Sequence, residues 1–186
     1  CGDSEGIFRE MCLASFVSDL LLAIEHLRNH PKINGDQIGI LGASLGGPVS
    51  VMAARECSVL QSLALWAPLG EGKLWRKDWS TRKPTKEEMS KLKLAGPKLV
   101  REFLSIEIMK ELEHIGHVPL LHIHGDADNV VLPHHADLYR RAREGGTATS
   151  NFLTLPNSDH SLCNHLSERR RLLKATTRWF RETLGH

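Results

Sequence analysis

The chain has 186 residues, of which 41% are hydrophobic and 25% charged, and its formal net charge is +2. These values are typical of one globular domain with a sizeable core. They argue against a nucleic-acid partner, and no stretch reaches the ~20 apolar residues of a membrane span.

The first part of the chain alternates helices and strands. Apolar residues at steps of three and four predict an amphipathic helix over residues 8–29. A short apolar strand is predicted at 37–41, an apolar helix at 44–55 and a second buried strand at 62–66.

The middle of the chain has a different composition, and we expect residues 71–117 to form a small helical lid inserted into the core. Residues 71–101 contain ten Lys and Arg but only four Asp and Glu, so this segment carries an excess of positive charge. This run is most simply a solvated face, and attraction of an anionic substrate is the alternative. Thr85 and Glu88 resemble a capping box that opens a short helix, and a further helix is predicted over 97–113.

The last part of the chain returns to the earlier pattern. Strands are predicted at 118–124 and 151–155, and helices at 133–143 and from Ser167 to a stop at Gly185. Short apolar strands that alternate with helices predict an α/β fold with a parallel sheet covered on both faces. We expect about four strands, with an exposed edge that another segment or a second copy of the chain would cover.

A Gly-x-Ser-x-Gly pattern stands between the strand at 37–41 and the helix after it. This order predicts a nucleophile elbow, in which a strained turn exposes the hydroxyl of Ser44. Gly42 and Gly46 would allow the strand and helix to approach closely, and the amide of Leu45 would face an oxyanion. The alternative is a glycine-rich turn that only packs.

Two later loops supply partners for a serine nucleophile, which needs a general base and an acid to orient that base. One loop carries Asp126 and Asp128, and the other carries His160. Both follow predicted strands, and the carboxyl ends of parallel strands meet at one edge of a sheet. The chain order Ser, Asp, His is the order of α/β-hydrolases.

With these motifs and the run Gly-Asp-Ser-Glu-Gly at residues 2–6, the chain resembles the serine α/β-hydrolases. It is most similar to compact carboxylesterases of the cinnamoyl and feruloyl esterase type and to the monoacylglycerol-lipase and serine-aminopeptidase group. The resemblance implies an N-terminally truncated α/β-hydrolase fold and no cofactor. It makes Ser44 the nucleophile, His160 the base and Asp128 the acid, with Asp126 as the alternative acid.

Other polar and aromatic residues receive weaker assignments. Trp66 and Trp75 are candidates for lining an apolar substrate pocket. Several histidines and one cysteine could in principle bind a metal, but the spacing between them in the sequence does not match a recurrent zinc motif. We therefore predict no metal site from these residues: His122, His124, His134, His135, His160, Cys163 and His165.

The predicted function is hydrolysis of small carboxylic esters through an acyl-enzyme. A thioesterase or a serine peptidase of the same fold is the alternative. In the resembling family a second oxyanion donor comes from a loop after an early strand. The 43 residues before Ser44 contain no such loop, so we expect the first strands to be absent. A catalytically impaired hydrolase-like fragment with a structural or partner-binding role is therefore the rival from another class.

Cysteine usage and the first residues predict the compartment. Cys1, Cys12, Cys57 and Cys163 show no C-x-x-C spacing, and a core of this size needs no disulfides. The polar start carries no visible signal peptide. We therefore expect free thiols and a cytoplasmic location.

Overall fold

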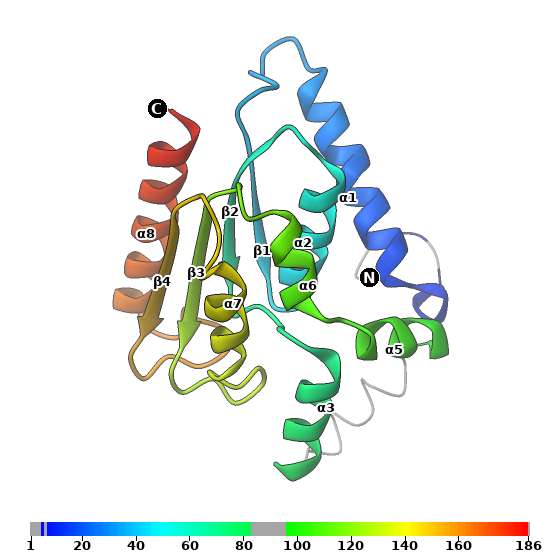
Figure 1. The fold of residues 1–186 in the computed structure, drawn as a ribbon. Helices are drawn as coiled ribbons and strands as arrows, with labels where there is room; N and C mark the ends of the chain where they lie inside the picture. Colours follow the sequence, from blue (N-terminus) through cyan, green and yellow to red (C-terminus); the bar gives the residue numbers. More distant parts are fainter. Residues whose placement is uncertain (1–4, 6, 83–95, 186) are drawn as a thin grey trace.

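Four parallel strands form the centre of the fold (Figure 1). The computed structural model describes residue 5 and residues 7–82 and 96–185. Hydrogen bonds join the strands in the order β1-β2-β3-β4, and every pair is parallel. The strands are β1 (Ile38–Ala43), β2 (Leu60–Trp66), β3 (Leu120–Gly125) and β4 (Ser150–Leu155). The predicted α/β class is confirmed, and the described residues form four strands, as expected.

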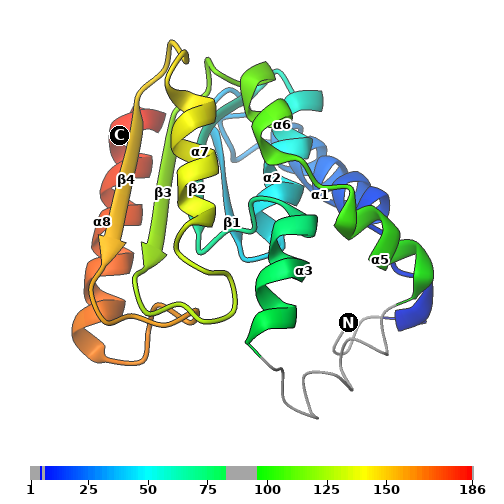
Figure 2. The ribbon, with the colours of Figure 1, turned by 60° about the horizontal axis from the view of Figure 1, so that its bottom comes forward.

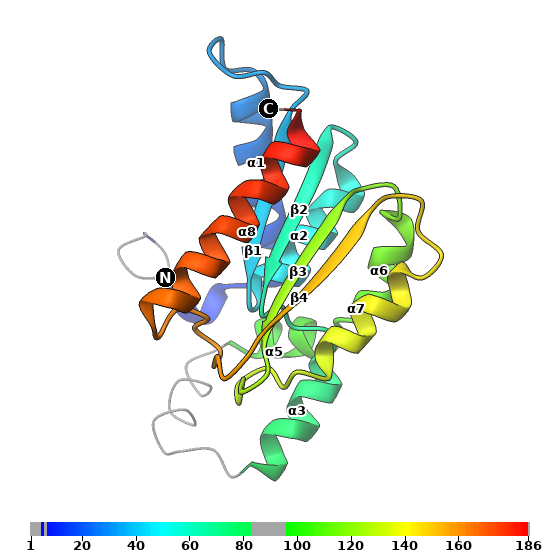
Figure 3. The same ribbon diagram turned by 90° about the vertical axis from the view of Figure 1, so that its left-hand side faces the viewer.

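Helices cover both faces of this sheet. On one face lie α1, α2, α6 and α7, and α8 lies along the other face (Figure 3). α3 lies beyond the end of the sheet toward which the strand arrows point (Figure 2). The described helices are η1 (Phe8–Glu10), α1 (Leu13–Arg28), α2 (Gly46–Glu56), α3 (Gly72–Thr81), α5 (Pro97–Leu104), α6 (Ile108–His114), α7 (His135–Arg143) and α8 (Leu166–Leu184).

The core has one layer on each side of the sheet, because side chains of a strand alternate between its faces. Leu63 and Leu65 of β2 pack among α1, α2, α6 and α7. Ala64, from the same strand, packs with Leu172 and Trp179 of α8. All six residues of β3 are buried, as expected for a strand inside a parallel sheet with both faces covered.

The predicted helix over 97–113 is wrong as one element. The structure divides it into α5 and α6, because Glu107 has a non-helical backbone and forms an antiparallel bridge with Glu71. Ile108 and Leu112 of α6 are fully buried in the core. We therefore propose that the lid segment runs from Glu71 to Glu107, a shorter range than the predicted 71–117. The expected capping box at Thr85 and Glu88 lies outside the described residues.

Other boundaries differ from the predictions by a few residues. The first helix begins at Leu13, after the short turn η1, instead of at residue 8. The last helix begins at Leu166, and the amide of His165 before it donates to the carboxylate of Glu168. Gly185 ends that helix in the left-handed conformation, at φ 78°, as predicted.

The sheet has an open edge at each side within the described part of the chain. β1 pairs with β2 alone, and β4 pairs with β3 alone. Leu41 of β1 is 42% exposed. None of the helices that the structure describes is long and apolar enough to cross a membrane.

Candidate active site

Ser44 lies in a sharp turn between β1 and α2. Its φ is 53°, a left-handed conformation that costs energy for a residue with a side chain. Hydrogen bonds to the end of β2 and to the loop after it hold the turn: the Ser44 amide donates to Trp66 O at 2.9 Å, and the Leu69 amide donates to Ser44 O at 3.1 Å. The backbone strain that the nucleophile-elbow interpretation requires is therefore present.

The glycines around Ser44 act differently from the prediction. A Cβ on Gly42 would lie 2.4 Å from Ser50 Oγ and 2.5 Å from Gly46 O, so this position has no room for a side chain. A Cβ on Gly46 would meet nothing within 4 Å among the described residues, so the close approach predicted there is wrong. The tight position is Gly47, where a Cβ would lie 2.4 Å from Pro68 Cβ.

Three loops bring Ser44, His160 and Asp128 together at the carboxyl ends of β1, β4 and β3. Ser44 Oγ and His160 Nε2 lie 2.9 Å apart. His160 Nδ1 lies 2.8 Å from Asp128 Oδ2. A carboxylate oxygen accepts hydrogen bonds, so Nδ1 carries the proton of the neutral ring and Nε2 is free to accept from the serine hydroxyl.

Asp128 is buried, and four donors surround its carboxylate. The amides of Val130 and Val131 each donate to Oδ1 at 2.9 Å. His160 Nδ1 and, at 3.2 Å, His124 Nε2 face Oδ2. Burial alone would raise the pKa of Asp128, but the contacts from His124 and His160 hold that pKa well below its usual range. Asp128 therefore stays ionised although it is 2% exposed.

Asp126, the alternative acid, has another contact. Its Oδ1 accepts the amide of Asn157 at 2.6 Å, so it joins the loop after β3 to the loop that carries His160. The Ala127 amide donates to Ser158 O across the same junction. Gly125 makes this approach possible, because a Cβ there would lie 2.1 Å from Ser158 O.

The loop that carries His160 is held by hydrogen bonds among its own residues. Asn157 and Leu162, which lie on either side of His160 in this loop, both have positive φ, 58° and 57°. Within it, Asp159 Oδ1 accepts from the amide and hydroxyl of Ser161, and Asp159 Oδ2 accepts from the Asn164 amide group. These hydrogen bonds lower the pKa of Asp159. The loop thus fixes His160 through its own polar side chains.

The amide of Leu45 is placed as a potential oxyanion donor. Leu45 precedes the first residue of α2, where the positive end of the helix dipole lies. In the part of the chain that the structure describes, its N–H has no hydrogen-bond partner. This free donor next to Ser44 has the character that an oxyanion site requires.

The two candidate pocket tryptophans lie in different places. The indole of Trp66 donates to Thr176 of α8 at 3.0 Å, and its ring packs on the α8 side of the sheet. The indole of Trp75 donates at 2.8 Å to Val130 O, in the loop of Asp128. Its ring stacks on Trp79 and meets the ring of Phe103 edge-on. Trp75 therefore belongs to an aromatic group beside the acid loop.

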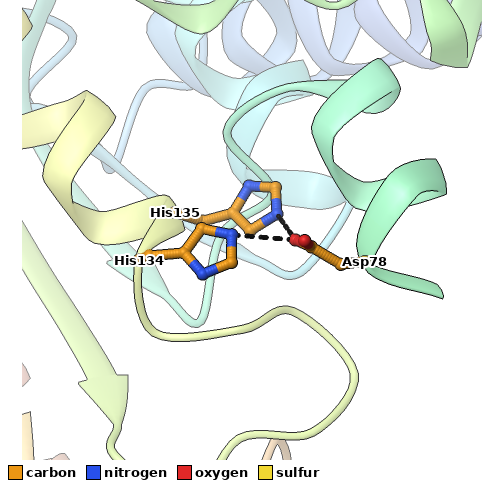
Figure 4. Close-up of side chains that lie close together, drawn as sticks. All are labelled: Asp78, His134 and His135. Carbon is orange, nitrogen blue, oxygen red and sulfur yellow. Dashed lines mark hydrogen bonds and ion pairs between the residues drawn. The ribbon is translucent and has the colours of Figure 1, made fainter. Parts of the chain in front are cut away.

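Asp78, His134 and His135 form a cluster that could offer ligands to a metal (Figure 4). Asp78 Oδ2 lies 2.8 Å from His134 Nε2 and 3.3 Å from His135 Nε2. The Gly70 amide, however, donates to His135 Nδ1, so the proton of the neutral ring is on Nε2. Burial lowers the pKa of His135 to about 4 and keeps it neutral. With Nε2 protonated, this histidine does not present a lone pair to a metal, and the cluster links α3 to α7.

The family match adds to this geometry. The prolyl oligopeptidase family matches residues 14–186. The chain belongs to the prolyl oligopeptidase family. The expected α/β-hydrolase superfamily is thereby confirmed. No curated protein sequence is similar enough to the chain to count as a match.

Solved structures with the same fold include peptidases and esterases. A puromycin-hydrolysing peptidase from Mycobacterium tuberculosis matches 91% of the chain at 20% identity and a TM-score of 0.75, and the match covers 25% of that protein. DcsB, solved with a substrate analogue, matches 100% of the chain at 16% identity and a TM-score of 0.76, over 78% of its length. Acetyl xylan esterase 1 from Thermoanaerobacterium sp. matches 90% at 16% identity and a TM-score of 0.64, over 52% of its length. The chain thus spans about a quarter to about three quarters of these proteins.

Proposed function

We propose that this domain is a serine hydrolase that cleaves carboxylic esters through an acyl-enzyme. The proposal rests on one observation: Ser44 Oγ, His160 and Asp128 form a continuous chain of hydrogen bonds of 2.9 and 2.8 Å. The same constellation of a hydroxyl, an imidazole and a buried carboxylate activates serine in unrelated hydrolases. The free amide of Leu45 and the strained backbone of Ser44 support the proposal.

In the proposed reaction, Ser44 Oγ attacks the ester carbonyl while His160 Nε2 takes its proton. Asp128 stabilises the imidazolium, and the Leu45 amide donates to the oxyanion of the tetrahedral intermediate. His160 then returns the proton to the leaving alcohol, and an acyl group remains on Ser44. Water, deprotonated by His160, releases the acid and restores the serine.

Peptide or amide cleavage is the second candidate, and the prolyl oligopeptidase family match favours it. The two reactions share the acylation and deacylation steps, but the amine leaving group of an amide depends more strongly on protonation by His160. Ester cleavage is therefore the less demanding reaction and is proposed first. A thioester would use the same groups, since the elbow does not select the acyl partner.

The proposed substrate is a small ester, and Trp75 is the aromatic residue that we place beside its binding site. Trp75 reaches the acid loop through Val130, whereas Trp66 is occupied by α8. We assign no described residue as the second oxyanion donor.

The test compares p-nitrophenyl esters with amino-acid p-nitroanilides. We expect an initial burst of p-nitrophenol that is stoichiometric with protein and absent in Ser44→Ala, followed by slower turnover. Faster release from the anilides than from the matching esters would assign the peptidase function instead. Equal ester cleavage by the protein and by Ser44→Ala would contradict both candidates.

A further inference from the structure

The feature that the proposed mechanism leaves unused is a second histidine at the acid, His124. We propose that His124 is a positioning residue that holds the Asp128 carboxylate in the orientation His160 needs. This inference rests on the proposed function, and it assigns a role to a residue that belongs to no part of the expected triad. Its Nε2 lies 3.2 Å from Asp128 Oδ2, the same oxygen that faces His160.

The proton on the His124 ring can be assigned from its surroundings. Nε2 lies 2.8 Å from the backbone oxygen of Val131, and a carbonyl oxygen can only accept. Nε2 therefore carries the proton, which faces Val131 O and Asp128 Oδ2 together. The other ring nitrogen, Nδ1, is buried without a partner among the described residues. His124 is thus a donor directed at the acid loop.

His124 belongs to a strand inside the sheet, whereas Asp128 belongs to a loop. It is the second-last residue of β3, which pairs with a strand on each side, and it is 3% exposed. Contacts to Val131 O and to Oδ2 therefore tie both the backbone and the carboxylate of the acid loop to the sheet.

The arrangement leaves the carboxylate little freedom to rotate. Oδ1 accepts two amides, from Val130 and Val131, and His124 Nε2 lies 3.2 Å from Oδ2 on one side. The remaining direction on Oδ2 is taken by His160 Nδ1. When His160 accepts the serine proton, Asp128 must remain an anion that stabilises the new imidazolium. A second donor on Oδ2 makes Asp128 a weaker base, so the proton stays on His160.

Matched substitutions separate positioning from packing. His124→Leu removes the donor, and His124→Gln keeps an N–H near the place of Nε2. His122→Leu is the control, because His122 is a buried, neutral neighbour of similar size that has no contact with Asp128. Each protein is first compared by circular dichroism and thermal melting. Labelling of Ser44 by a fluorophosphonate is then timed across pH, and the NMR signal of the His160 Nδ1 proton is recorded.

We expect His124→Leu to label about 10- to 100-fold more slowly, the loss typical of one hydrogen bond to a charged group. The acid limb of its pH–rate profile should move to higher pH, because the coupled His160–Asp128 pair then holds its proton more tightly. His124→Gln should recover most of the rate, and His122→Leu should label at close to the original rate.

Two results would overturn the positioning role: an unchanged rate and pH profile in folded His124→Leu, or an equal loss in His122→Leu. Failure of the unaltered protein to label at Ser44 would instead refute the proposed function. In that case the NMR signal decides the role of His124. A shift of the His160 Nδ1 proton in His124→Leu but not in His122→Leu supports it, and an unchanged signal refutes it.

Discussion

At Gly125, a single added methyl group should push the loop that carries His160 away from the end of β3. Gly125 ends β3 and lies against the loop that carries His160. In Gly125→Ala, the new Cβ would lie 2.1 Å from Ser158 O, 2.7 Å from Ser158 C and 2.9 Å from Asp159 O. All three atoms belong to the backbone, so no side chain can rotate away, and the His160 loop must move.

The expected cost follows from this displacement. Overpacking of a well-packed region destabilises a protein by about 1–3 kcal/mol, which lowers the melting temperature by about 2–12 °C for a domain of this size. A shift of His160 by about 1 Å from Ser44 lowers the rate of a positioned reaction by about 100-fold. We therefore expect a folded protein that melts earlier and labels Ser44 much more slowly.

The assay pairs thermal melting with the rate of fluorophosphonate labelling. Gly145→Ala is the matched control, because a Cβ there meets nothing within 4 Å among the described residues, and it should change neither quantity. A Gly125→Ala protein that melts and labels like the unaltered one would refute the close approach between the acid loop and the His160 loop.

Three further predictions concern the acid, a buried cation and pH. Asp128→Asn should slow Ser44 labelling by about 10⁴-fold, as expected when the base loses its orienting anion, whereas Asp126→Asn should have a much smaller effect. A larger loss in Asp126→Asn than in Asp128→Asn would make Asp126 the acid. Arg143 donates to Ile115 O and Val118 O from a buried position. Arg143→Met should therefore lower the free energy of unfolding, measured by urea denaturation, by about 2–4 kcal/mol, and a loss below ~0.5 kcal/mol would contradict this. The pKa of His135 is about 4 in the folded protein and ~6.5 when unfolded. Between these pH values His135 binds a proton only in the unfolded state, so the stability of the folded protein should fall as the pH drops from 6.5 to 4. His135→Asn, which keeps an acceptor for the Gly70 amide, should weaken that dependence in urea titrations, and an unchanged slope would refute the assignment.

Local sequence patterns were enough to predict most of the elements. The strand before Ser44, the helix after it and the left-handed stop at Gly185 depend on apolar spacing and on glycine. The positions of Asp128 and His160 after two parallel strands predicted that they would meet Ser44, and the structure brings all three side chains together. These features depend on neighbours in sequence and on the common edge of a parallel sheet.

Features that depend on distant segments could not be predicted. The break between α5 and α6 follows from the bridge of Glu107 with Glu71, 36 positions away in the sequence. The contact of His124 with the acid also escaped prediction, although alternation along a strand puts His122 and His124 on the same face. The sequence did not show the path of the loop that places Asp128 Oδ2 next to Nε2 of His124. Likewise, spacing alone could not show which glycine, Gly46 or Gly47, packs tightly.

The proposed function depends most directly on the reactivity of Ser44. The decisive measurement is treatment of the folded protein with a fluorophosphonate, followed by peptide mapping by mass spectrometry. We predict one covalent adduct per chain at Ser44, no adduct in Ser44→Ala, and at least ~10³-fold slower labelling in His160→Gln. A folded protein that stays unlabelled, or one labelled equally well after Ser44→Ala, would contradict the proposed triad.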